Sequence, residues 1–122
     1  MIILGLAVAG AVGAVLRYLV DRTVQERARS RLPVGITVVN LSGSLVLGVL
    51  TGSALHHGVS AAWLTVAGTG LIGAYTTFST FTFDTVGLME EGAWGGAAVN
   101  VLIGLGAGLG AAAAGLALGA LV

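Results

Sequence analysis

The stretch Gly68-Thr-Gly-Leu-Ile-Gly73-Ala-Tyr-Thr-Thr-Phe-Ser-Thr-Phe-Thr-Phe83 decides how this chain folds. Three glycines are followed by five serine and threonine residues between Thr76 and Thr82. Glycine loosens a helical backbone, and hydroxyl side chains compete for its hydrogen bonds. We therefore expect a helix that is broken near Gly73–Thr77. The alternative is a continuous helix whose hydroxyls bond back to the preceding turn.

The composition around this stretch is that of a membrane protein. Hydrophobic residues make up 57% of the 122 residues and charged residues 8%, whereas a soluble domain carries about 25% charged residues. The net charge is zero and there is no cysteine. These features exclude a basic surface for nucleic acid, disulfides and thiol nucleophiles.

Four apolar segments predict one all-α domain with four transmembrane helices, because a span needs about 20 apolar residues. The segments cover residues 2–20, 34–55, 60–89 and 94–122. The first lacks the basic start of a signal peptide, so we expect a permanent membrane helix. In the fourth, glycine pairs at i and i+4 favour tight helix contact; the pairs are Gly104/Gly108, Gly106/Gly110 and Gly115/Gly119.

A break at membrane depth is tolerated only where protein or water satisfies the freed backbone groups. We therefore expect the break in the third segment to be buried, with free carbonyls that could bind a cation.

Polar residues form a stripe along the second segment at helical spacing; they are Thr37, Asn40, Ser44, Gly48 and Thr51. Such a stripe lines a wet path or packs against another helix. Asn40 favours the wet path, because an amide at mid-membrane is costly without partners.

Phe78 and Phe81 follow the expected break and are interleaved with hydroxyls. Packing is the ordinary role of such rings. The positive ring edge, however, can also face an anion, and together with hydroxyls and an amide donor it suits a small anion that must shed water.

Ionisable residues inside the spans are few. Arg17, near the end of the first segment, could extend to the lipid headgroups or form a positive vestibule that attracts anions. Asp84 could pair with Arg17, join a polar network or face water. No catalytic constellation is present, so we do not expect an enzyme.

Three motifs stand out: Gly10-Ala-Val-Gly13-Ala14-Val-Leu-Arg17-Tyr18, Val39-Asn40-Leu-Ser-Gly43-Ser44-Leu-Val-Leu-Gly48 and Gly73-Ala-Tyr-Thr76-Thr77-Phe78-Ser79-Thr80-Phe81. In residue type and spacing they resemble the Fluc/CrcB fluoride channel family. The third is the most specific, and together they span three of the four segments.

The resemblance implies an antiparallel, dual-topology dimer with two anion pores that export fluoride passively across a prokaryotic inner membrane. It implies a structural sodium ion at the dimer centre, held by the backbone carbonyls of Gly73 and Thr76, and a vestibule at Arg17. The pore residues implied are Asn40, Phe78, Phe81, Ser79 and Thr80.

The chain departs from the family pattern in several places. Asp84 stands where the family usually has glutamate, and Ile36 replaces a usual threonine. In the fourth segment, Asn100 and Gly104 occupy the places of a usual tyrosine and serine. Part of a pore is therefore expected to be altered or non-conducting.

Four arginines lie between the first two segments, and the other loops carry no lysine or arginine. The positive-inside rule places this loop in the cytoplasm and both termini outside. A single orientation implies pairing with a homologous chain of the opposite orientation; the homodimer is the alternative.

Two rival functions remain at this stage. A small multidrug-type proton-coupled exporter needs a mid-span carboxylate, which the first segment lacks before Asp21. A non-conducting scaffold or partner subunit would explain the glycines but not Asn40 or the Thr/Ser/Phe stretch.

Overall fold

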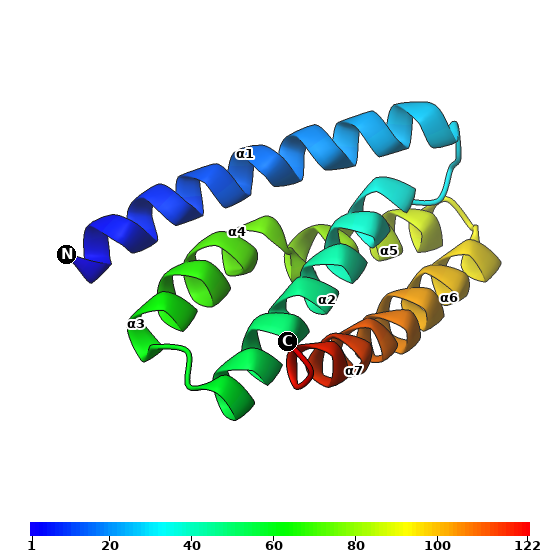
Figure 1. Cartoon of the computed structure of the whole chain (residues 1–122). Coiled ribbons are helices and arrows are strands. Elements are labelled where there is room, and N and C mark those ends of the chain that lie inside the picture. The colour runs from blue at the N-terminus through cyan, green and yellow to red at the C-terminus, as the bar shows by residue number, and fades with distance from the viewer.

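The protein is entirely helical, and the computed structural model describes all 122 residues (Figure 1). Two long helices come first, α1 (Ile2–Ala28) and α2 (Val34–His57). The third segment is divided into α3 (Ala61–Leu64), η1 (Thr65–Ile72), α4 (Gly73–Tyr75) and α5 (Phe78–Glu90). The fourth consists of α6 (Trp94–Leu102), η2 (Ile103–Ala107) and α7 (Gly108–Gly119).

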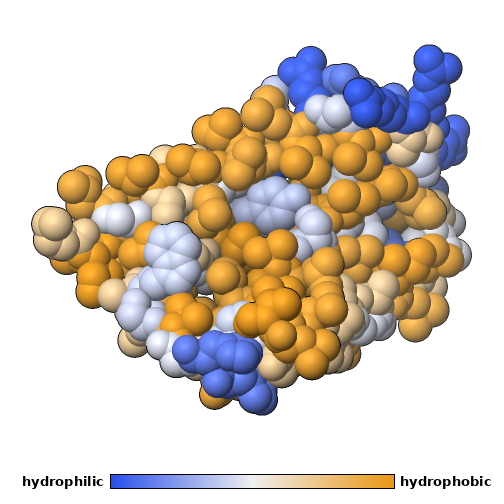
Figure 2. Space-filling view, in the orientation of Figure 1, coloured by the Kyte–Doolittle hydropathy of each residue, from blue (hydrophilic) through white to orange (hydrophobic).

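Three helical segments are long and apolar enough to cross a membrane: Ile2–Ala28, Val34–His57 and Trp94–Gly119. The third segment is not among them, because the interruption leaves no helix of sufficient length. Figure 2 shows apolar residues covering the middle of the molecule, with hydrophilic groups gathered at the α1–α2 connection and at the far end of α2. Exposed apolar side chains over the length of the helices are what lipid requires.

The first helix is longer than the sequence predicts, since it ends at Ala28 rather than near Val20. Its last turns are polar and held by an exposed ion pair between Arg22 and Glu26, 2.8 Å apart. Arg, Gln and Glu are good helix formers. Hydropathy therefore marks where the apolar stretch stops, not where the helix ends.

Glycines set the closest helix contact, between α2 and α7. A Cβ added to Gly48 would lie 3.0 Å from the Cα of Gly115, and a Cβ added to Gly119 would lie 3.0 Å from the Cα of Gly52. The expected Gly115/Gly119 pair therefore does pack tightly. Gly106, Gly108 and Gly110 instead face open space. The predicted Gly106/Gly110 pair therefore makes no helix contact within one chain, and of the Gly104/Gly108 pair only Gly104 does, against Phe81.

The predicted interruption of the third segment is present at Thr76–Thr77. Both residues are extended, with φ/ψ of −78°/157° and −149°/123°. The preceding helix ends at Tyr75, and the Thr77 side chain caps α5 by accepting a hydrogen bond from the Thr80 amide. Gly43 of α2 gives the break room, since a Cβ there would overlap the Thr76 side chain.

Two stretches of wide π-helical turns, η1 and η2, were not expected from the sequence. One precedes the break and the other lies in the fourth segment. Such turns are frequent at functional sites, and η2 supplies Gly104 and Leu105 to the cavity described next.

Candidate functional site

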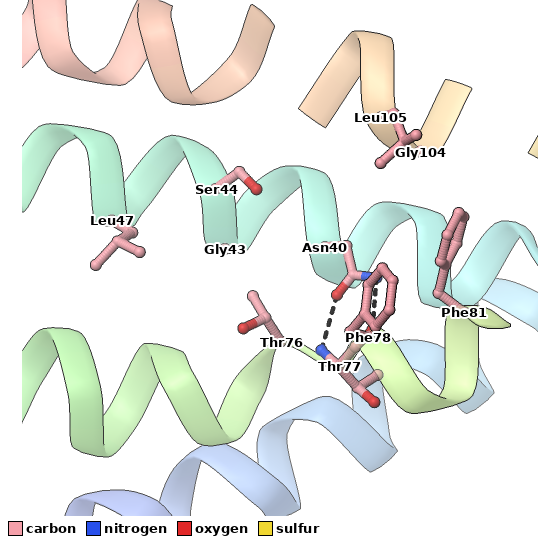
Figure 3. A pocket seen from close by; sticks show the side chains of 10 residues that line it. All are labelled: Asn40, Gly43, Ser44, Leu47, Thr76, Thr77, Phe78, Phe81, Gly104 and Leu105. Carbon is pink, nitrogen blue, oxygen red and sulfur yellow. Dashed lines mark hydrogen bonds between the residues drawn. The ribbon is translucent and has the colours of Figure 1, made fainter. Parts of the chain in front are cut away.

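A cavity of about 250 Å³ lies beside the break, between α2, α5 and η2 (Figure 3). Its polar wall comes from an amide, a serine and the two threonines of the break, and its apolar wall from two phenylalanines and two leucines. No charged side chain lines it. The lining residues are Asn40, Gly43, Ser44, Leu47, Thr76, Thr77, Phe78, Phe81, Gly104 and Leu105.

Asn40 pairs with the backbone of Thr77 in both directions. Its Nδ2 donates to the Thr77 carbonyl at 2.9 Å, and its Oδ1 accepts from the Thr77 amide at 2.9 Å. Figure 3 shows the Asn40 amide reaching across the cavity edge to the break. A primary amide carries two N–H donors, so the second remains for another partner.

The break leaves the four carbonyls of residues 73–76 without their helical donors. In a continuous α-helix the Gly73 carbonyl would accept from the Thr77 amide, and the Thr76 carbonyl from the Thr80 amide. Here the Thr77 amide donates to Asn40 and the Thr80 amide to the Thr77 hydroxyl, at 3.2 Å. The two carbonyls predicted to bind sodium, those of Gly73 and Thr76, are thus two of the four that the break sets free.

The two predicted ring contacts both line the cavity. The centroids of Phe78 and Phe81 lie 5.8 Å apart with the rings tilted by 39°. Phe81 is buried against Gly104, where an added Cβ would lie 3.1 Å from Cζ. Phe78 is 72% exposed, so its ring is available to a partner or a ligand outside the single chain.

The predicted hydroxyls, Ser79 and Thr80, do not line this cavity. Both lie close to the Thr77 hydroxyl, at 3.2 and 3.1 Å. They are therefore connected to the cavity wall through Thr77, which the sequence did not single out as a site residue.

Thr80 lines a second cavity, of about 380 Å³, near the α1–α2 connection. This cavity is strongly polar and also contains Asp84; its other ionisable side chains are Asp21, Arg31 and Glu91. Asp84 thus lines a polar cavity and makes no ion pair with Arg17. Arg17 is half-buried on α1 and lines neither cavity.

Asn100, one of the departures in the fourth segment, supports the back of Phe81. It is buried, and its Nδ2 donates to the Thr85 hydroxyl at 2.9 Å. The Thr85 hydroxyl in turn donates to the Phe81 carbonyl at 2.7 Å. An amide in an apolar segment signals a buried partner, but the sequence does not identify Thr85 as that partner.

Comparison with known proteins places the geometry in context. Residues 4–116 match the family model described as CrcB-like protein, Camphor Resistance (CrcB). A protein of Leifsonia xyli subsp. xyli, named fluoride-specific ion channel FluC 1, is 40% identical over 121 residues, covering 99% of this chain and 88% of that protein. A protein of the same name from Streptomyces avermitilis is 49% identical over 112 residues, covering 91% and 90%. Another, from Nocardia farcinica, is 47% identical over 110 residues, covering 89% and 74%.

Proposed function

This chain belongs to the CrcB-like family, and from that membership we propose that it is a fluoride-specific ion channel through which fluoride leaves the cytoplasm passively. The observation that carries the proposal is the cavity beside the break. It combines an amide, hydroxyls and two aromatic rings, with no charged side chain in its wall.

Uncharged donors suit fluoride transport. A small, strongly hydrated anion needs substitutes for its water at each step, yet a fixed positive charge would hold it too tightly for rapid release. The second N–H of Asn40 and the positive edges of Phe78 and Phe81 provide such substitutes in the cavity. We assign Ser79 and Thr80 to the same path, with Thr80 at the polar cavity and Arg17 at a vestibule.

The direction of transport follows from acid–base chemistry and membrane potential. Neutral HF enters a cell and dissociates in a less acidic cytoplasm, which traps the anion. Export through a channel then gains about 2.3 kcal/mol per charge for each 100 mV of inside-negative potential. The route requires no bond-making step, and we place the protein in the inner membrane of a prokaryotic cell.

The chain functions, in this proposal, as an antiparallel dimer with itself or with a homologous chain of opposite orientation. The exposed Phe78 supports a partner that completes the site. The exposed Gly73 lies at the same break. The donor-free carbonyls of Gly73 and Thr76 fit a sodium ion, which prefers oxygen ligands, and such an ion would join the two subunits at the centre.

The two rival functions find no support. The relatives are named as channels. Asp84, the one carboxylate of residues 60–89, lines the second, polar cavity rather than the cavity at the break, so the mid-span exchange site of a proton-coupled exporter is missing. A scaffold would have no use for an amide paired with the backbone of a broken helix.

Fluoride efflux from liposomes tests the proposal. Purified chain is reconstituted alone and together with a homologous chain from the same genome, and a fluoride electrode records release of trapped fluoride. We expect efflux in at least one condition and none from chloride-loaded vesicles. Vesicles that stay sealed to fluoride in both conditions, with insertion verified by protease protection, would overturn it.

A further inference from the structure

We propose that Asn40 is a positioning residue that keeps the third segment broken, and that it thereby controls the cation affinity of the Gly73 and Thr76 carbonyls as well as the shape of the anion cavity. The inference rests on the proposed function, and it assigns to one side chain a second task beyond donating to fluoride.

The pairing between Asn40 and Thr77 is a two-point contact. Both polar atoms of the side chain are used, at 2.9 Å each, and both the amide and the carbonyl of Thr77 are satisfied. These residues are 37 positions apart in the chain. The contact is thus equivalent to one rung of an antiparallel sheet, made by a side chain in place of a second strand.

This contact decides where the Thr77 amide donates. Without it, the nearest competing acceptor in a helical chain is the Gly73 carbonyl four residues back. If that bond formed, α4 would continue through the break and the Gly73 carbonyl would no longer be free. Thr77 would also lose the extended φ/ψ of −149°/123° that lets its hydroxyl cap α5, and the Thr80 amide would return to the Thr76 carbonyl.

The same contact fixes the ring pair. Thr77 immediately precedes Phe78, and the cap on Thr80 orients the first turn of α5, which carries both phenylalanines. Asn40 and the rings line one cavity (Figure 3). Cation carbonyls and anion contacts are therefore linked through a single residue, Thr77, whose amide and carbonyl both bind Asn40.

Substitutions at Asn40 separate its two tasks. Asn40→Leu removes both hydrogen bonds. Asn40→Asp keeps an acceptor for the Thr77 amide but removes the N–H donors. If Asn40 only donated to the anion, both variants would lose fluoride flux and both would keep the sodium affinity of the parent chain. If Asn40 also positions the Thr77 backbone, only Asn40→Leu should lose sodium affinity, because Asn40→Asp keeps an acceptor for the Thr77 amide.

The readout is the sodium concentration that half-maximally raises the melting temperature, with sodium replaced by N-methylglucamine at constant ionic strength and no fluoride present. We expect Asn40→Leu to raise this concentration about tenfold or more, the scale of one to two lost hydrogen bonds. Asn40→Asp should stay within about threefold of the parent chain. Fluoride flux should fall in both.

Two controls frame the comparison. Asn100→Leu removes another buried amide, and Phe78→Leu removes a ring from the cavity. Neither side chain hydrogen-bonds to the Thr77 backbone, so both variants should leave the sodium midpoint unchanged. The inference would be overturned if Asn40→Leu left the half-maximal sodium concentration unchanged, or if sodium did not raise the melting temperature of the parent chain. Neither result alters fluoride efflux by the parent chain, which tests the proposed function separately. If Asn40→Leu fails to fold, Asn40→Thr, which retains an acceptor but no amide donor, must reproduce the Asn40→Asp pattern or the inference fails.

Discussion

The ring of Phe81 in α5 lies directly against the α-carbon of Gly104 in η2, at a spacing that leaves no room for a Cβ. The backbone of Phe81 is linked to the fourth segment as well, by hydrogen bonds from Asn100 to the Thr85 hydroxyl and from that hydroxyl to the Phe81 carbonyl. The fourth segment thus limits the space open to one of the two rings of the cavity.

Gly104→Ala should therefore displace the Phe81 ring and lower fluoride flux. Overpacking of this kind costs about 1–3 kcal/mol, and we expect a matching fall in melting temperature together with at least a severalfold loss of efflux. Gly106→Ala is the matched control, because nothing lies within 4 Å of the Cβ it adds. Equal flux in the two variants would show that the Phe81 position is irrelevant to conduction.

Phe78→Leu tests the ring edge. Leucine keeps the apolar character but has no positive edge, and ring contributions of this type are worth about 0.5–1.5 kcal/mol. We expect efflux to fall by roughly threefold to tenfold, with little change in thermal stability because the side chain is exposed in the single chain. Full efflux in this variant would mean that Phe78 serves as packing only.

The α2–α7 contact should be intolerant of even one methyl group. A Cβ at Gly115 would meet the Leu45 carbonyl and lie 3.0 Å from the Cα of Gly48. Gly115→Ala must therefore push two backbones apart, and we expect a loss of about 2 kcal/mol or more in unfolding free energy, measured by denaturation in mixed micelles. Gly110→Ala, whose Cβ meets nothing within 4 Å, should be neutral or slightly stabilising. Equal stability of the two alanine variants would contradict the packing described.

Gln25 holds the connection between α1 and α2. Its Nε2 donates to the carbonyls of Ser30 and Leu32 at 2.8 and 3.1 Å, and its Oε1 accepts from the Gly35 amide at 3.0 Å. Gln25→Ala should lower the unfolding free energy by about 1–3 kcal/mol. The neighbouring Glu26→Ala breaks only an exposed ion pair with Arg22, so it should cost well under about 1 kcal/mol. Thermal melts of the two variants measure both losses. If Gln25→Ala were no less stable than Glu26→Ala, the role assigned to Gln25 would be refuted.

Topology can be measured directly. The arginines at the α1–α2 end predict that both termini face outward. A cysteine placed after Val122 in this cysteine-free chain should react with an impermeant maleimide applied to intact cells expressing the chain alone. If about half of the molecules reacted only after the cells were permeabilised, the chain would have a dual orientation, and the homodimer would be favoured.

The break was predictable because it has a local cause. Glycines before Gly73 and hydroxyls after Thr76 weaken the helix whatever surrounds it, and the interruption lies within the expected range. The cavity residues Asn40, Phe78 and Phe81 were likewise identified from residue type and motif. The end of α1 was wrong by two turns, because the apolar pattern carries no information on where a polar helix stops.

Long-range pairings were not predictable. Nothing in the sequence shows that Asn40 pairs with Thr77, that Asn100 meets Thr85 or that Gly104 accepts the Phe81 ring, since each partner lies on another helix. Ser79 and Thr80, predicted as pore hydroxyls, instead contact the Thr77 hydroxyl two and three residues away; that local contact follows from the cap on α5, which the sequence did not identify.

The interruption at Thr76–Thr77 also has an electrical consequence. The helical run that ends at Tyr75 presents the negative end of its dipole, and α5, which begins at Phe78, presents its positive end, each equivalent to about half an elementary charge. A chain of zero net charge thus holds opposite fractional charges a few residues apart without using one ionisable side chain. These partial charges do not titrate. Any substitution that restores a continuous helix through Thr76–Thr77 removes both of them together.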